Sequence, residues 1–152
     1  MSRIWSHDPL KGGFHLASGL KDAGQLPRAM TICKQLSSEL NDKTLAFNVA
    51  AGHINGTWGE LLYELNELDE AHRYAKKGVE HLEQDHDVSH LGYRYSCLAK
   101  ILCSKRDLAG AEGIVPKMDD LMLTSTIPPW VLTRIKAVKA QILLINAVRL
   151  RE

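Results

Sequence analysis

A pattern that recurs about every 40 residues constrains the fold of this chain more than any other feature. Three alanines, Ala29, Ala71 and Ala111, stand 42 and 40 residues apart. A leucine stands nine residues before each alanine and a small residue twelve before it: Leu20, Leu62 and Leu102, and Ala17, Gly59 and Ala99. A fourth, incomplete copy has Ala140 and Leu143 at these two positions. One helical hairpin cannot bury its own apolar face, so a repeat of this length predicts hairpins that stack on one another.

The segment from residue 58 to residue 83 shows the predicted hairpin most clearly. Its first half has apolar residues at spacings of three and four, which places them on one helical face: Trp58, Leu61, Leu62 and Leu65. Asn66-Glu67 interrupts this pattern, and the acidic residues Asp69 and Glu70 mark a second helix, because the helix dipole favours negative charge at its start. Strand signals are nearly lacking, so the predicted fold class is all-α, with three helix pairs and a C-terminal helix.

The predicted boundaries follow the repeat. Residues 1–12 are expected to be a poorly ordered lead, because Pro9 and the glycines at 12 and 13 oppose a helix before Phe14. The repeat domain is expected over 13–152, with units at 13–41, 44–84, 89–123 and a partial unit at 129–150. Glycines 52, 56 and 59 fall inside a predicted helix from Thr44 to Leu65, where each costs about 1 kcal/mol, so they predict close helix contact. Pro116 predicts a kink or an early helix end near Val115.

Charge and cysteine content exclude several classes of function. The chain has 19 basic and 18 acidic residues, whereas a nucleic-acid or acidic-membrane surface needs a basic excess. No apolar run is long enough for a membrane span, and the N-terminus lacks the apolar core of a secretory signal. The three cysteines lack C-x-x-C spacing and read as reduced core thiols. We therefore expect a cytoplasmic protein without membrane contact.

The recurring pattern resembles the tetratricopeptide repeat in its longer form, which has about 40 residues per unit. The resemblance lies in the positions of the small residue, the leucine and the motif L-x-x-A. Three segments resemble the central helical-repeat domain of MalT-like, LuxR-family, ATP-dependent transcriptional regulators of bacteria: GTWGELLYELNELDEAHRYAKKGVE, LAKILCSKRDLAGAE and IPPWVLTRIKAVKAQILL. The resemblance covers residues 14–144. It implies a right-handed helical-hairpin solenoid without catalysis or cofactors, which receives effector or partner signals in a regulator. At its end the chain departs from the family, because Asn146-Ala147-Val148 replaces the expected turn.

This chain lacks the phosphate-loop motif and the basic helix pair of the modules that flank such a domain in the family. We therefore expect no direct nucleic-acid binding. The alternative function is a free-standing tetratricopeptide-like adaptor that scaffolds protein partners.

The resemblance also implies a binding groove, because the first helix of each tetratricopeptide hairpin lines the concave face. Counting from the small residues places these side chains in the groove: Phe14, Ser18, Lys21, His53, Glu60, Tyr63, Tyr93, Ser96, Lys100, Cys103, Arg134 and Gln141. Aromatic rings with charges of both signs suit a protein or peptide segment, or a small-molecule effector. The alternative is a solvated helix face without a ligand.

Two further features were weighed as sites. His81, His86 and His90 have spacings that resemble a metal cluster, but they fall in a hydrophilic linker without a fixing scaffold, so no metal is predicted. No catalytic motif accompanies them. The last helix is apolar on more than one side at Ile142, Leu143 and Ile145. It is interpreted either as a capping helix or as a self-association surface of a homodimer.

Overall fold

The computed structural model describes residues 9–41, 48–84 and 86–151, and the regular structure within these ranges is entirely α-helical. The helices are α1 (Pro9–Asp22), α2 (Leu26–Asn41), α3 (Asn48–Glu64), α4 (Leu68–Gln84), α5 (Val88–Ser104), α6 (Leu108–Thr124) and α7 (Pro129–Arg149). The all-α prediction is therefore confirmed. Residues 1–8 of the predicted lead at 1–12, and the predicted helix start at Thr44, lie outside the described residues.

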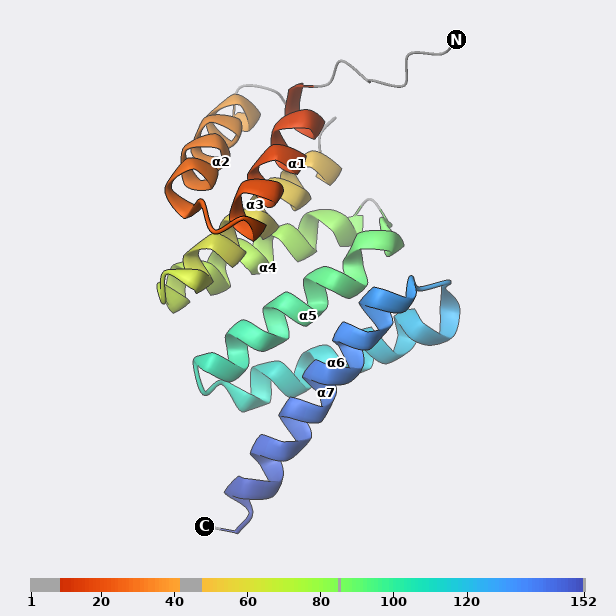
Figure 1. The fold of residues 1–152 in the computed structure, drawn as a ribbon. Coiled ribbons are helices and arrows are strands. Elements are labelled where there is room, and N and C mark those ends of the chain that lie inside the picture. The colour runs from red at the N-terminus through yellow and green to blue at the C-terminus, as the bar shows by residue number, and fades with distance from the viewer. Residues whose placement is uncertain (1–8, 42–47, 85, 152) are drawn as a thin grey trace.

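The helices follow one another through the molecule in chain order (Figure 1). α1 packs on α2, α3 on α4 and α5 on α6, and α7 packs against α5 and α6. Each odd-numbered helix also contacts the next odd-numbered one, so α1, α3, α5 and α7 form a continuous series. Among the described residues, no helix has the length and apolarity needed to cross a bilayer.

Three turns repeat the same backbone geometry at the spacing seen in the sequence. Gly24, Asn66 and Arg106 each adopt a positive φ, at 74°, 61° and 61°. In each turn, the carbonyl of the repeat leucine accepts the N–H of the residue five positions on, at 2.8–2.9 Å: Gln25 to Leu20, Glu67 to Leu62, and Asp107 to Leu102. This is the bond that closes a helix C-terminus through a left-handed residue. The aligned turns are therefore structurally equivalent.

The fourth copy lacks this turn. α7 continues beyond Leu143 as far as Arg149, so its leucine position lies inside the helix rather than at its end. The departure of Asn146-Ala147-Val148 from the repeat pattern therefore corresponds to an uninterrupted helix.

Close packing of α3 on α4 depends on small residues. A Cβ atom at Gly59 would lie 2.8 Å from the backbone nitrogen of Ala75 and 3.0 Å from the carbonyl oxygen of Ala71. A Cβ at Gly78 would lie 2.7 Å from the nitrogen of Gly56. Real Cβ atoms do not approach backbone this closely, so the prediction that glycines of α3 permit close contact is confirmed at Gly59 and at Gly56, which faces Gly78.

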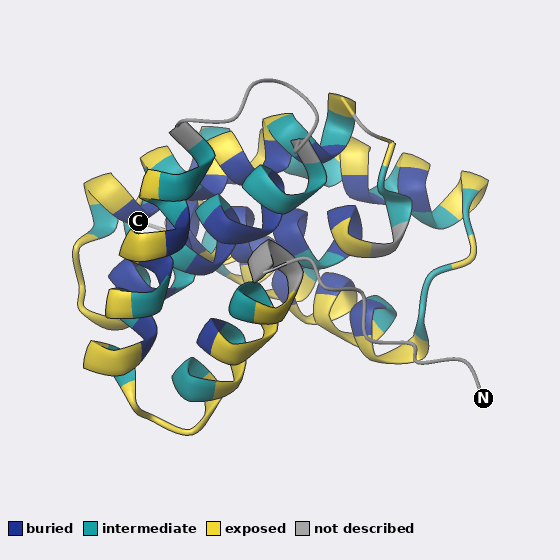
Figure 2. Cartoon of the chain, turned by 90° about the horizontal axis from the view of Figure 1, so that it is seen from above, coloured by how far each residue is buried: buried dark blue, intermediate teal, exposed yellow. Residues whose placement is uncertain are grey.

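The buried residues form one large cluster and two smaller ones, distributed along the helix interfaces (Figure 2). The large cluster joins α3 to α7, with Leu82, Met118 and Ile135 fully buried. A smaller cluster joins α1 and α2 to α3 through Ala17, Cys33 and Leu61. The helices of the chain are therefore each packed on at least one side by a neighbouring helix.

One predicted helix start is wrong, and one of the two outcomes predicted at Pro116, the early helix end, does not occur. α1 begins at Pro9 rather than Phe14, because a proline in the first turn sacrifices no helical hydrogen bond. α6 does not end at Val115 but continues through Pro116 to Thr124. Beyond the proline, Met118 is 0% exposed, so burial of the last turns offsets a cost of about 3 kcal/mol.

Candidate functional site

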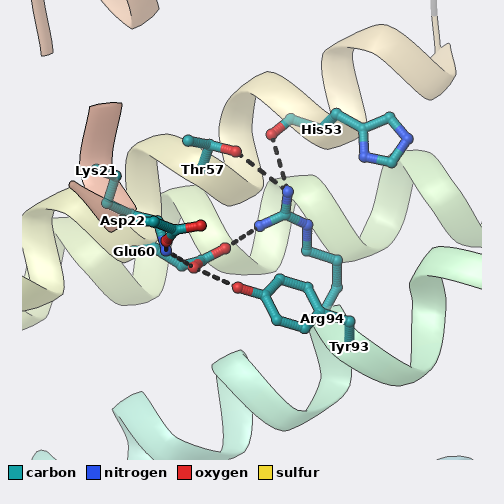
Figure 3. Close-up of polar contacts among 7 residues, drawn as sticks. All are labelled: Lys21, Asp22, His53, Thr57, Glu60, Tyr93 and Arg94. Carbon is teal, nitrogen blue, oxygen red and sulfur yellow. Dashed lines mark hydrogen bonds and ion pairs between the residues drawn. The ribbon is translucent and has the colours of Figure 1, made fainter. Parts of the chain in front are cut away.

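The odd-numbered helices bring several predicted groove residues together around one carboxylate. Glu60 of α3 accepts hydrogen bonds from Lys21 Nζ of α1 at 2.7 Å and from the Tyr93 hydroxyl of α5 at 2.6 Å (Figure 3). The guanidinium of Arg94, also on α5, donates to its other oxygen. Lys21 Nζ also lies 3.1 Å from Asp22 Oδ1. Glu60 therefore connects one helix from each of the three pairs.

Arg94 was not among the predicted groove residues. Its side chain is 4% exposed, and its second terminal nitrogen donates to the carbonyl of His53 at 3.3 Å and to the Thr57 hydroxyl at 3.2 Å. The guanidinium occupies the space beside Gly56, where a Cβ would lie 2.6 Å from it. No local sequence signal points to this arginine, because Gly56 and Glu60 belong to a different helix.

The charges of this cluster stabilise one another. Burial opposes ionisation of Glu60, but Arg94 and Lys21 outweigh it and hold its pKa below the usual value. Burial also opposes the charge on Lys21, yet Glu60 and Asp22 raise the pKa of Lys21 above its usual value. Burial is the main cause of the raised pKa of Tyr93, and nearby negative charge adds to it, so the Tyr93 hydroxyl stays protonated and donates. The cluster is therefore an ion-pair network in which Glu60 is ionised at neutral pH, although Arg94 Nε is buried without a hydrogen-bond partner.

A pocket of about 60 Å³ opens beside this network. Its lining includes five predicted groove residues: Lys21, Glu60, Tyr63, Lys100 and Arg134. Glu64, Cys97 and Ile101 complete the lining. The convergence of these side chains from α1, α3, α5 and α7 makes this pocket the candidate binding site.

Two exposed cations of the pocket rest on aromatic rings. The Lys100 ammonium lies 4.7 Å from the centre of the Tyr63 ring, and the Arg134 guanidinium lies 4.7 Å from the centre of the Tyr93 ring. Within the described ranges, neither cation forms an ion pair with a carboxylate. These two charges are therefore available to a ligand.

Other predicted groove residues lie elsewhere. The Ser96 hydroxyl is buried and donates to the carbonyl of Gly92 in its own helix, and Cys103 is buried in the core, so their assignment to the groove is wrong. Ser18 is half-buried and Gln141 is exposed, and neither lines the pocket. Phe14 and His53 line a different cavity.

That second cavity lies at the other end of α3. Its volume is about 340 Å³, and its lining consists of Phe14, His15, Val49, Ala50, His53, Asp87 and His90. Burial, followed by the charge of His90, lowers the pKa of His53 to about 4, so His53 is neutral at neutral pH. The sequence had placed His90 with His81 and His86, whereas the structure places it beside His53, with ring centres 4.2 Å apart.

The buried thiols are poor nucleophiles. Burial raises the pKa of Cys33 and of Cys97 to about 12, so both remain protonated at neutral pH.

The apolar end of α7 is only partly exposed. Leu143 is 68% exposed and Ile145 is half-buried, but Ile142 is 2% exposed and belongs to the large core cluster. The assignment of Ile142 to a self-association surface is therefore wrong, because it faces the helices beneath.

Comparison with known proteins adds no relative: no protein-family model, curated protein or solved structure matches the chain.

Proposed function

We propose that this chain is a non-catalytic, tetratricopeptide-like solenoid whose odd-numbered helices bind an acidic segment of a partner protein. The observation that carries the proposal is the pocket in which Lys21, Glu60, Tyr63, Lys100 and Arg134 meet. Contacts between successive odd-numbered helices and the 42- and 40-residue spacing of equivalent turns support the solenoid. Its handedness is expected to be right-handed, as in the family it resembles.

The charges of the pocket favour an acidic ligand. Glu60 is already engaged by Lys21 and Arg94, so one carboxylate is shared between two cations. Lys100 and Arg134 then face only Glu64 among the remaining charged residues of the lining. A carboxylate that enters beside them gains charge-assisted hydrogen bonds, and the rings of Tyr63 and Tyr93 offer it an apolar flank.

The wider role follows from the resemblance to MalT-like regulators: the domain would receive a partner or effector and alter the packing of neighbouring hairpins. The Glu60 network supports this role, because it joins three helix pairs and a ligand that disturbs it acts on all three. A scaffold adaptor is the second candidate. An adaptor binds two proteins at once without changing shape, whereas a signal receiver shows altered hydrogen exchange across α1, α3 and α5 upon binding.

Selection of peptides from an unbiased library on the wild-type chain tests the binding proposal. Selected peptides are expected to be rich in Asp and Glu, and their affinity is expected to fall about tenfold in the double variant Lys100→Ala/Arg134→Ala, equivalent to about 1.4 kcal/mol. The matched control, Lys136→Ala/Arg149→Ala, removes the same charge from exposed positions of α7 outside the pocket. Equal losses in both variants, or peptides without acidic enrichment, would contradict the proposal.

A further inference from the structure

Three side chains with metal-ligating atoms converge where α3 meets the start of α5. Asp87 Oδ2 lies 3.6 Å from His53 Nε2 and 2.9 Å from His90 Nδ1. One ligand atom from each residue lies within 4.8 Å of the other two. His53 is buried, Asp87 is half-buried and His90 is exposed, so the cluster runs from the core to the surface.

The position of Asp87 shows that its carboxylate is used for something other than local helix stabilisation. Asp87 precedes α5 as its N-cap residue, yet its side chain makes no capping hydrogen bond. Asp107 holds the same position before α6 and accepts a hydrogen bond from the Gly110 nitrogen at 2.9 Å. The carboxylate of Asp87 instead faces two imidazoles from different helices.

We propose that His53, Asp87 and His90 form a three-ligand site for a divalent transition-metal ion of the Zn²⁺ type. Metal–ligand bonds of about 2.0–2.1 Å place the donor atoms of a tetrahedral site roughly 3.3 Å apart. The distances of 2.9 and 3.6 Å from Asp87 Oδ2 lie on either side of that value, so small side-chain adjustments complete the site. Two imidazoles and one carboxylate suit zinc and its neighbours better than magnesium or calcium, which prefer oxygen ligands.

The surroundings leave a coordination position open. The three ligands line the cavity of about 340 Å³ that Phe14, His15, Val49 and Ala50 complete. The Phe14 ring stacks on the His53 ring, with centres 4.5 Å apart and planes 24° apart, which fixes the orientation of that ligand. Three protein ligands and an adjoining cavity leave the fourth position to water or a small anionic ligand.

A bound ion would also tie helices together. His53 belongs to α3, whereas Asp87 and His90 lie at the start of α5, so the metal links two successive helix pairs. This link lies at the opposite end of α3 from Glu64, which lines the pocket of the proposed function, so either site can fail without the other.

Titration of the tag-free, full-length chain with Zn²⁺ and Co²⁺ by isothermal calorimetry tests the proposal. The wild type is expected to bind one ion per chain, and bound Co²⁺ is expected to show the intense visible absorption of low-coordinate cobalt rather than the weak bands of the hydrated ion. His90→Asn and Asp87→Asn are each expected to weaken binding at least tenfold. The matched control is His86→Asn, an exposed histidine with φ 54° in the same turn, where asparagine tolerates the backbone. It is expected to change affinity less than twofold.

Three results overturn the proposal: no stoichiometric binding by the wild type, unchanged binding by His90→Asn, or equal losses in His90→Asn and His86→Asn. His90 is exposed, so its replacement is expected to leave the helical circular dichroism unchanged and the comparison interpretable. If Asp87 and His90 form only a surface hydrogen bond, the His90→Asn variant loses that bond, but its affinity for Zn²⁺ equals that of the wild type.

Discussion

Replacing Gly59 with alanine tests the close packing of α3 on α4. Alanine favours a helix over glycine by about 1 kcal/mol, which alone would stabilise the protein. Its methyl group would, however, lie 2.8 Å from the backbone nitrogen of Ala75, and backbone cannot move aside as a flexible side chain can. Forcing an extra methyl into a packed interface costs roughly 1–3 kcal/mol. Because the neighbour is backbone, we expect the upper part of this range, about 2–3 kcal/mol, which leaves a net loss of about 1–2 kcal/mol after the propensity gain.

Gly113→Ala is the matched control for this substitution. Gly113 also lies inside a helix, α6, but a Cβ there meets no atom within 4 Å. Only the propensity gain remains, so this variant is expected to be more stable than the wild type by about 0.5–1 kcal/mol.

Urea denaturation followed by circular dichroism measures both free energies of unfolding. The slope of the free energy of unfolding against urea concentration should stay constant, because neither substitution alters the surface that is exposed on unfolding. If Gly59→Ala proved neutral or stabilising, α3 and α4 could separate freely and the close-packing account would be wrong.

Three further expectations concern individual side chains. Because the pKa of Glu60 is lowered in the folded state, its ion pairs stabilise the fold above about pH 4.5, and this stabilisation is lost as the pH falls below that value. In acid, the free energy of unfolding of Glu60→Gln should therefore depend less steeply on pH than that of the wild type. At pH 7 the same variant should lose about 3 kcal/mol, measured by urea denaturation, because Arg94 is left buried without its partner. Asp107→Ala should cost about 1 kcal/mol in the same assay through loss of its helix cap, and an unchanged stability would show that the cap contributes nothing. Leu143→Glu should leave the urea midpoint unchanged, whereas Ile142→Glu should unfold the chain, because Leu143 is exposed and Ile142 is buried. Light scattering that compares Leu143→Glu with the wild type shows whether Leu143 supports a homodimer.

The sequence was sufficient to predict the helix pairs because the repeat leaves a local signature. In each turn the second residue after the first helix adopts a positive φ, and Gly24 and Asn66 are residue types that favour it. Arg106 is not such a type, so the spacing of the repeat rather than the residue itself identifies the third turn. The close contact at Gly59 was predictable for a related reason, since several glycines within one helix are costly without a packing role.

Features that depend on contacts between distant residues were not predictable in the same way. Arg94 is buried because Glu60 and the space beside Gly56 accommodate its charge, and neither partner is near it in the sequence. His90 likewise lies beside a residue that is distant in the sequence, His53, although the spacing pattern grouped it with its neighbours His81 and His86. The early helix end predicted at Pro116 fails for the opposite reason, because burial of the turns that follow it overrides a local preference.

The chemistry of the pocket gives the proposed docking of an acidic partner a preferred side. A carboxylate that approaches Glu60 meets a like charge whose oxygens are already engaged by Lys21, Tyr93 and Arg94. Approach on the side of α5 and α7 is favoured instead, because Lys100 and Arg134 stand on aromatic rings there rather than in ion pairs. Arg134 rests on the ring of Tyr93, whose hydroxyl donates to Glu60. Under the proposed function, a ligand that draws Arg134 away from that ring would act on the residue that links α5 to α3, which would couple binding at α7 to the packing of the helix pairs before it.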